Sequence, residues 1–380
     1  MENVLEKTGM INGPTNVVRM EGKFAGINKI IYLFMDYHIP VTRETRCPNY
    51  TSLDIYQYFA INLEKTNHII DFMFEENQSY TKRPDDLHRK RYIDEVSNYF
   101  NSKFNDGIIK KKKGEKVNVR FHYVDVRDNM GHDVYHSLYS IQNMVNMLND
   151  TSINFTNNIV DNIKKEINYA VERLNLWKGL LFEDLGVNLK KYQDTTSKRN
   201  NVSKIITKMR KEYRHREVLK NMEDLFDYIH SLFNDLVDRL NEFINIIDNH
   251  VYMIDIIQNG KLCYSKSYNS YFYGISYDDY LNFSTDLLKK LDIISVKNIV
   301  LFANIMDIFF LRRFLDKDYI THAIVYTGAA HSLNYIQHLL TKYNFRITHT
   351  SYSLEKNIDK LNQHLKKYGD KFDKKEYEKN

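Results

Sequence analysis

Three apolar runs of strand length lie far apart in the chain, and each ends beside ionisable side chains. They cover residues 29–36, 68–75 and 323–327. A continuous apolar run is typical of a strand buried on both faces, and such strands are typical of parallel sheets. In open α/β sheets, functional groups collect at the carboxyl ends of the strands. The sequence therefore predicts an α/β fold, with a mostly parallel central sheet, flanking helices and a functional rim.

The pattern along the chain divides it into four parts. Strands and helices alternate over residues 1–131, which predicts the first part of the α/β core. Residues 132–262 are polar, helix-forming and almost free of Gly and Pro, which predicts a long helical insertion or cap. The α/β character returns over 263–354, and the charged tail 355–380 is expected to be flexible.

Within these parts the periodicity predicts individual elements. Strands are expected over 17–22, 29–35, 68–75, 117–127, 322–327 and 345–350. Helices are expected over 52–65, 85–104, 278–291, 304–315 and 332–343. A single apolar stripe over 219–247 predicts a helical hairpin or a helical cap on the sheet.

The composition excludes several classes of protein. Lys and Arg number 54 against 49 Asp and Glu, and only residues 110–113 form a tight basic cluster, which argues against nucleic-acid binding. Cys47 and Cys263 are too few for a disulfide framework or a zinc cage. No apolar run approaches the roughly 20 residues of a membrane span, and the first residues do not resemble a signal peptide. We therefore expect a soluble, intracellular protein of undetermined oligomeric state.

Four predicted strand ends carry ionisable side chains. These are Asp36 with His38, Glu75 with Glu76, Asp125 with Arg127, and His331. Residues two apart on a strand project to the same side, and strand ends of one sheet lie close together. Gly328 lets the backbone approach closely before His331. Arg120, His122 and His132 flank the third strand, where structural roles are expected.

Two kinds of chemistry suit this set of side chains. Imidazole and carboxylate donors together suit Mn, Zn, Co or Fe, so a divalent metal site is one prediction. Its ligands would be Asp36, His38, Glu75, Asp125 and His331. The other prediction is metal-free catalysis, with His38 or His331 as general base, Asp36 and Glu75 orienting it and Arg127 stabilising an oxyanion. No phosphate-binding loop, Gly-X-Ser-X-Gly elbow or His-Glu-X-X-His helix is present in the sequence.

The order of these motifs resembles the superfamily that joins erythromycin esterases, ChaN-like haem-binding lipoproteins, TraB proteins and TIKI metalloproteases. Its members typically begin with Gly-Glu-X-His, here Met35-Asp36-Tyr37-His38, and finish with Gly-X-X-His, here Gly328-Ala329-Ala330-His331. Met35 thus replaces the glycine and Asp36 the glutamate. The segment from Asp36 through Cys47-Pro48 to Glu75 is also similar to uncharacterised proteins of large nucleocytoplasmic DNA viruses. The abundance of Asn, Lys, Ile and Tyr agrees with this similarity, because it is typical of proteins from A/T-rich genomes.

The resemblance covers about residues 30–128 and 323–350. It implies a mostly parallel sheet with a helical insertion and, in several branches, hydrolysis of an ester or peptide bond with or without a divalent cation. We therefore expect a hydrolase acting on an unknown small molecule or peptide, in the host cytoplasm or virion. The alternatives are a non-catalytic viral protein that binds host partners or serves in assembly, and a binder of haem or another small ligand.

Overall fold

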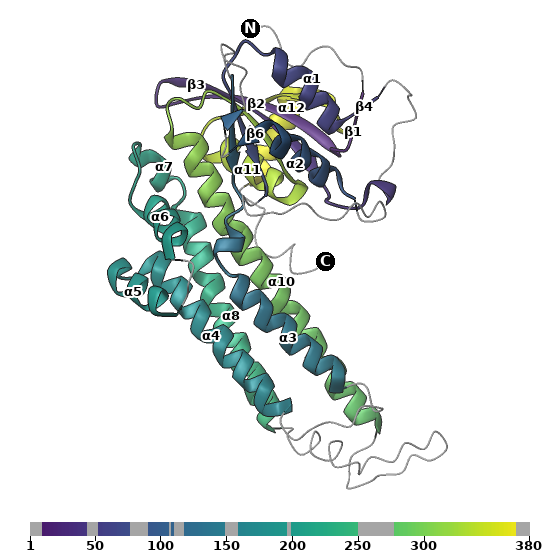
Figure 1. The fold of residues 1–380 in the computed structure, drawn as a ribbon, viewed down its shortest axis with the longest axis vertical. Helices are drawn as coiled ribbons and strands as arrows, with labels where there is room; N and C mark the ends of the chain where they lie inside the picture. The colour runs from purple at the N-terminus through teal and green to yellow at the C-terminus, as the bar shows by residue number, and fades with distance from the viewer. Residues whose placement is uncertain are drawn as a thin grey trace. The chain divides into compact units, whose positions relative to one another are not determined.

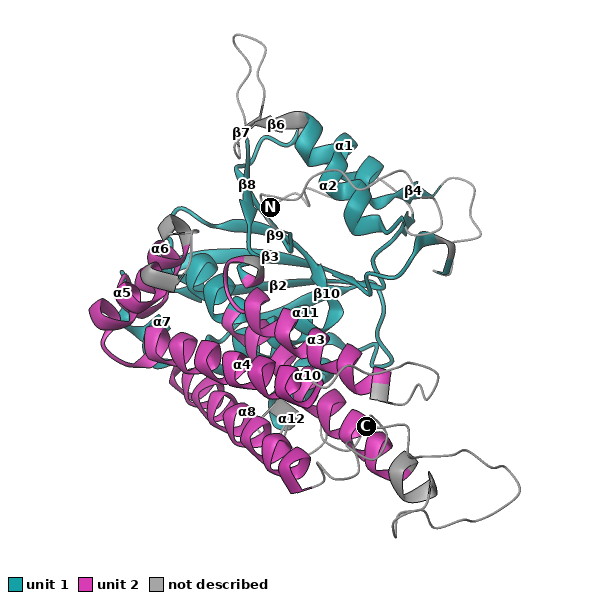
Figure 2. Cartoon of the chain, turned by 60° about the horizontal axis from the view of Figure 1, so that its bottom comes forward, with its two compact units in different colours: residues 1–126, 213–221, 306–380 teal, residues 127–212, 222–305 magenta. Residues whose placement is uncertain are grey.

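The computed structural model describes residues 10–43, 52–76, 90–105, 108–109, 118–148, 159–195, 199–249 and 277–369. Figure 1 labels the helices and strands along the chain. The chain forms two compact units, coloured in Figure 2. Unit 1 comprises residues 1–126, 213–221 and 306–380, and unit 2 comprises 127–212 and 222–305. The helical unit therefore interrupts the sheet unit twice in sequence.

Unit 1 holds all the strands of the described residues. Its elements are β1 (Ile11–Asn12), β2 (Asn16–Phe24), β3 (Ile27–Asp36), η1 (Val41–Arg43), β4 (Leu53–Asp54), α1 (Ile55–Lys65), β5 (Ile70–Phe74), α2 (Tyr92–Lys103), β6 (Phe104–Asn105), β7 (Ile108–Ile109), β8 (Val119–Tyr123), α7 (Arg216–Lys220), the end of α10 (Tyr277–Asp316), β9 (His322–Gly328), α11 (Ala329–Lys342), β10 (Arg346–Thr350) and α12 (Ile358–Gly369). Unit 2 holds η2 (Arg127–Asn129), α3 (His132–Leu148), α4 (Ile159–Phe182), α5 (Leu185–Thr195), α6 (Arg199–Arg210), α8 (Glu223–Asn249) and the first part of α10.

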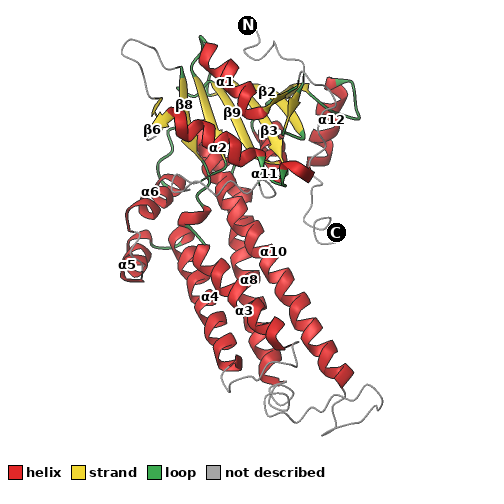
Figure 3. Ribbon diagram, turned by 45° about the vertical axis from the view of Figure 1, so that its right-hand side comes forward, coloured by secondary structure: helices red, strands yellow, loops and turns green. Residues whose placement is uncertain are grey.

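The central sheet has mostly parallel strands, as the sequence predicted, but it is mixed and not wholly parallel. Its order is β10-β2-β3-β9-β5-β8, drawn in yellow in Figure 3. The strands β3, β9, β5 and β8 are parallel, but β2 is antiparallel to both β3 and β10. Only Ala25 and Gly26 separate β2 from β3, and both have positive φ. A two-residue turn joins antiparallel neighbours, since a parallel connection needs a crossover of a dozen or more residues.

The late strand β9 lies between the two early strands β3 and β5. Asp36 at the end of β3 is in register with Gly328 at the end of β9, and Phe74 at the end of β5 is in register with Tyr326. The Glu75 N–H continues this pairing by donating to the Tyr326 carbonyl at 3.1 Å. Three carboxyl ends therefore lie side by side at one edge of the sheet.

The two faces of the sheet are covered differently. Helices α1 and α2 pack on one face over an aromatic core that includes Phe59, Phe72 and Phe100. On the other face, Lys29 of β3 is 1% exposed, and its Nζ donates to the carbonyls of Phe314, Lys317 and Ile320 at 2.6–3.0 Å. An ammonium group at the carboxyl end of a helix satisfies carbonyls that have no partner within it. Lys29 thus ties the end of α10 to the sheet.

Unit 2 is built on the long helices α3, α4, α8 and the first part of α10. Side-chain bonds from α10 reach α3 through Asp292 and α8 through Lys290 and Lys297. The sequence predicted separate helices over 278–291 and 304–315, but α10 is continuous from Tyr277 to Asp316. The predicted stripe 219–247 is in turn divided between the short α7 and the 27-residue α8.

One helix of the described residues is long and apolar enough to cross a membrane. It covers Asn282–Asp316 of α10, and 61% of its most apolar window is buried inside the protein, as in the core helix of a soluble protein. At the C-terminus, the tail predicted to be flexible contains the helix α12 over Ile358–Gly369, where Asn362 bonds the backbone of Ile347 in β10. Residues 370–380 of that tail lie outside the described residues.

Candidate active site

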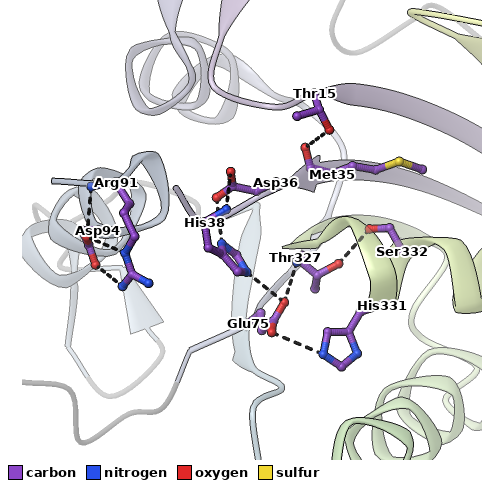
Figure 4. Close-up of polar contacts among 11 residues, drawn as sticks. Thr15, Met35, Asp36, His38, Glu75, Arg91, Asp94, Thr327, His331 and Ser332 are labelled. Carbon is purple, nitrogen blue, oxygen red and sulfur yellow. Dashed lines mark hydrogen bonds and ion pairs between the residues drawn. The ribbon is translucent and has the colours of Figure 1, made fainter. Parts of the chain in front are cut away.

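Side chains from the ends of β3, β5 and β9 meet at the edge of the sheet (Figure 4). His38 lies two residues after β3, Glu75 directly follows β5, and His331 is the third residue of α11, which begins where β9 ends. His38 Nε2 lies 3.4 Å from Glu75 Oε2, and His331 Nε2 lies 3.4 Å from Glu75 Oε1. The two imidazoles therefore face a single carboxylate, and each lies next to a different oxygen of that carboxylate.

His38 is held in an unusual backbone conformation. Its φ is 55°, in the left-handed region that residues other than glycine seldom adopt. Asp36 stabilises this turn: one carboxylate oxygen accepts the His38 N–H at 3.2 Å, and the other lies 2.9 Å from His38 Nδ1. Asp36 therefore fixes both the backbone conformation and the ring orientation of His38, with Nε2 facing Glu75.

Glu75 occupies the centre of the site and is almost completely buried. The Gly328 N–H, at the start of α11, donates to Glu75 Oε2 at 2.5 Å. A Cβ atom added at Gly328 would lie 3.2 Å from His38 Nε2 and 3.3 Å from Glu75 Oε2. The missing side chain of Gly328 thus leaves room for these two groups to meet over β9, and the amino terminus of α11 favours the negative charge of Glu75.

His331 is held by a residue that the sequence analysis missed. Asp307 of α10 places Oδ1 2.6 Å from His331 Nδ1, and its Oδ2 accepts from Asn334 Nδ2 at 2.9 Å. Asp307 is fully buried. A signal for it was present in the sequence, because a lone carboxylate interrupts the apolar run from Ile305 to Leu311, and buried charges are rare unless they are paired.

Of the three side chains that meet, that of His38 is the most exposed to solvent. The His38 side chain is 26% exposed, whereas those of Glu75 and His331 are 4% and 8% exposed. Tyr37 and Ile39, on either side of His38 in the chain, are also exposed. Among the clustered side chains, His38 is therefore the one best placed to meet a substrate.

The surroundings of His38 favour its protonated form. Burial by itself lowers the pKa of His38, but the hydrogen bonds from Asp36 and Glu75 and the charges of these carboxylates outweigh it and raise the pKa to about 9. His38 is therefore an imidazolium at neutral pH. In this form both of its ring nitrogens carry hydrogens, one toward each carboxylate.

Asp125 and Arg127 lie after the end of β8. Asp125 is half-buried in the connection that follows the strand in unit 1, and Arg127 is the first residue of η2 in unit 2. The contacts that define the cluster join His38, Glu75 and His331 to Asp36 and Asp307. The roles predicted for Asp125 and Arg127 in metal binding and oxyanion stabilisation stay predictions.

Arg120 and His122 form a separate network near the start of the parallel strands. Arg120 donates twice to the buried carboxylate of Asp71 in β5, and His122 Nε2 lies 2.6 Å from the same group. Arg313 donates to His122 Nδ1 at 2.7 Å. Because a guanidinium group only donates, Nδ1 is unprotonated and His122 is neutral, in agreement with the lowering of its pKa by burial. These contacts indicate a structural role.

The guanidinium group of Arg91 was also missed from the sequence. Arg91 forms an isolated bridge with Pro40, just beyond His38, and makes a two-point ion pair with Asp94. Its pKa is raised first by the bond to Asp94 and further by the charge of Asp36. Arg91 therefore contributes positive charge near the Asp36 side of the cluster.

The chain is similar to a family of proteins and to several viral relatives. A profile of a family of unknown function, DUF5847, matches residues 9–376. Two relatives from Acanthamoeba polyphaga mimivirus are the uncharacterized proteins R706 and R161, which are 32% and 31% identical to this chain. Each alignment covers 94% of this chain and 90% or 91% of the relative. A third, R160, is 30% identical over 90% of this chain. No solved structure matches.

These comparisons bear on the resemblance noted from the motifs. The similarity to viral proteins is confirmed, because the matched relatives are mimivirus proteins and cover nearly the whole chain. The wider resemblance to erythromycin esterases, ChaN, TraB and TIKI proteins stays a prediction. With its profile matching residues 9–376, the chain belongs to the DUF5847 family.

Proposed function

We propose that this protein is a hydrolase of an ester, amide or related bond and that His38, Glu75 and His331 carry its proton transfers. The observation that supports the proposal best is the convergence of two imidazole Nε2 atoms on the Glu75 carboxylate, each at 3.4 Å. Both Nδ1 atoms are engaged by other carboxylates, at 2.9 and 2.6 Å. This arrangement holds the rings in place and leaves the Nε2 side for chemistry, as general acid–base catalysis requires.

His38 acts as the general acid in this proposal. It is the exposed member of the cluster, and its pKa of about 9 keeps it protonated at neutral pH. Glu75 accepts a proton from the attacking water as the water oxygen bonds to the carbonyl carbon. The bond to the alcohol or amine then breaks, and the leaving group takes the proton of His38 Nε2. The Glu75 proton then passes to solvent by way of His331 Nε2, which faces Glu75 Oε1, and reprotonation of His38 completes the cycle.

A divalent cation is the other chemistry predicted from the sequence. The donor types suit Mn, Zn, Co or Fe, and the carboxylates on both Nδ1 atoms resemble the outer partners of metal-bound histidines. However, no group of three or more His, Cys, Asp or Glu side chains within the described ranges is arranged to hold a metal ion. The mechanism proposed here therefore uses no metal, and the metal site stays a prediction.

The proposal is tested with p-nitrophenyl butyrate as an ester probe and a peptide p-nitroanilide as an amide probe. With the peptide p-nitroanilide, whose amine leaving group needs a proton, we expect His38→Asn, Glu75→Gln and His331→Gln each to lower kcat/KM by about 100-fold or more, the usual size of general acid–base effects. His349→Asn is the control, because His349 is an exposed residue of β10 outside the cluster. Wild-type kcat/KM should fall as the pH rises through about 9, where His38 loses its proton.

Metal dependence is measured on the same samples. Dialysis against EDTA should leave hydrolysis unchanged, and elemental analysis should find less than one metal ion per chain. Stoichiometric metal together with EDTA inactivation would replace the proposed mechanism by a metal-dependent one. Equal hydrolysis by wild type and all three cluster variants would refute the assignment of the site.

A second candidate function is a non-catalytic viral protein that acts through partner binding, in the host cytoplasm or the virion. It is favoured by three exposed apolar side chains that follow one side of α10, namely Ile293, Val296 and Ile299, which are 46–59% exposed. Absence of hydrolysis of both probes by well-folded protein would favour this candidate over the first.

A further inference from the structure

Asp307 is a buried carboxylate in the most apolar part of a helix. Its neighbours along α10 are Ile305, Met306, Ile308 and Phe309, and all of them are buried. Moving an ionised carboxylate out of water costs several kcal/mol unless donors replace the lost hydration. The donors here are the His331 ring and the Asn334 amide.

The contacts of Asp307 define the positions of the hydrogens. An ionised carboxylate only accepts, so the 2.6 Å contact between Asp307 Oδ1 and His331 Nδ1 requires a hydrogen on Nδ1. The other oxygen accepts from Asn334 Nδ2 at 2.9 Å. His331 and Asn334 are three residues apart on α11 and therefore lie on the same face of that helix. Both oxygens of Asp307 are thus engaged by one turn of α11.

We infer that Asp307 is a positioning residue that keeps a hydrogen on His331 Nδ1 and thereby directs His331 Nε2 toward Glu75. Asp307 does not meet the substrate and acts only through His331. Its effect on catalysis rests on the proposed function, whereas its effect on the hydrogens of the His331 ring does not. The two claims can therefore fail separately.

The first test is NMR of the full chain labelled with ¹⁵N-histidine, in which two-bond correlations report which ring nitrogen carries hydrogen. The His331 signals are assigned from their loss in His331→Gln. Wild-type His331 should show a protonated Nδ1. A wild-type spectrum with Nδ1 unprotonated would overturn the inference without recourse to any Asp307 variant.

The second test is Asp307→Asn, which keeps the shape of the side chain and replaces one acceptor oxygen by a donor. The Asn amide can donate to Nδ1, so we expect the hydrogen of His331 to move to Nε2. The matched control is Asp316→Asn, because Asp316 is also fully buried on α10 but bonds the backbone N–H groups of Arg214 and His215. This control should leave the His331 nitrogens unchanged.

Activity is then read on the same samples. With p-nitrophenyl butyrate, Asp307→Asn should lower kcat by at least about tenfold, since a wrong tautomer at a catalytic histidine can cost up to about 10⁴-fold. A folded Asp307→Asn protein with unchanged His331 nitrogens would overturn the inference. If Asp307→Asn changes the protonation of the His331 nitrogens but the wild type hydrolyses neither probe, the inference is supported and the proposed function is refuted.

Discussion

The length of the Asp36 side chain explains how the first motif works in this chain. The resemblance leads one to expect glutamate at this position, but the shorter carboxylate of Asp36 accepts the N–H of His38 two residues further on and also reaches its ring. Asp and Asn side chains characteristically bond the backbone N–H two residues further on. The replacement of Glu by Asp therefore accompanies the left-handed conformation of His38.

The raised pKa of His38 predicts a pH-dependent stability. The pKa of His38 is about 9 in the folded chain, against about 6.5 for an unperturbed histidine. Its stabilising contribution is therefore complete below pH 6.5 and is lost as the pH rises through 9. The free energy of unfolding should fall by at most about 3 kcal/mol across this window. Urea unfolding between pH 6 and 10 measures the change.

His38→Asn supplies the reference for this measurement. Lys29 titrates in the same pH range as His38 but changes the stability in the opposite direction. Burial lowers the pKa of Lys29 to about 8, so its contribution to stability rises as the pH rises above that value. The difference between wild type and His38→Asn cancels this and other shared contributions. A difference that is the same at pH 6 and pH 10 would contradict the raised pKa.

At the scale of single residues, part of the site was predictable. Asp36, His38, Glu75 and His331 could be named because each follows an apolar strand pattern, and the structure places their side chains within one network. Asp307 was not found because its partner His331 is 24 positions away on another element. Periodicity describes one element at a time and does not report which helix packs behind a strand end.

The start of α3 depends on close packing between Gly131 and Phe302 within unit 2. Gly131 has a φ of 86°, and a Cβ atom there would lie 2.4 Å from the Phe302 ring. Gly131→Ala should therefore lower the free energy of unfolding by about 2–4 kcal/mol, through backbone strain and overpacking together. Chemical denaturation followed by circular dichroism measures the loss.

Gly26→Ala is the matched control for Gly131→Ala. Gly26 has a similar φ of 83°, but no atom lies within 4 Å of an added Cβ. Its substitution should cost only the backbone strain, about 1 kcal/mol. If both substitutions cost the same, contact with Phe302 does not contribute. Combining Gly131→Ala with Phe302→Leu should recover part of the loss.

At the scale of elements, the sequence predicted strands better than long helices. The predicted strands 17–22, 29–35 and 322–327 correspond to β2, β3 and β9. The continuity of α10 was missed because its surroundings change along its length. Ile293, Val296 and Ile299 are exposed in the first part, whereas most residues from Leu301 to Asp316 are buried on every side. No single apolar stripe runs through such a helix.

For the molecule as a whole, the order of strands in the sheet differs from their order in the chain. β9 follows β8 in sequence, yet it lies between β3 and β5. Apolar runs indicate which strands are buried, but they do not indicate which strands are neighbours in the sheet. Only the antiparallel pairing of β2 with β3 could be deduced from the sequence, because two residues connect them.

Truncation tests the dependence of the sheet on β9. A chain that ends at residue 320 lacks β9, α11 and β10, so β3 and β5 lose the neighbour that joins them. Hydrogen exchange should show loss of protection over β3 and β5, whereas a chain that ends at residue 369 should keep it. Retained protection in the shorter chain would mean that β3 and β5 are stable without β9.

The central position of β9 also has a consequence for biosynthesis. The ribosome completes all of unit 2 before it synthesises residues 322–328. After β5 is made, roughly 250 further residues must therefore be translated before β9 is available, which takes about 10–50 s at ordinary rates. During that time the backbone edges of β3 and β5 that later pair with β9 have no native partner and are open to aggregation. Nascent chains of this protein should therefore depend on host chaperones until the last strands emerge.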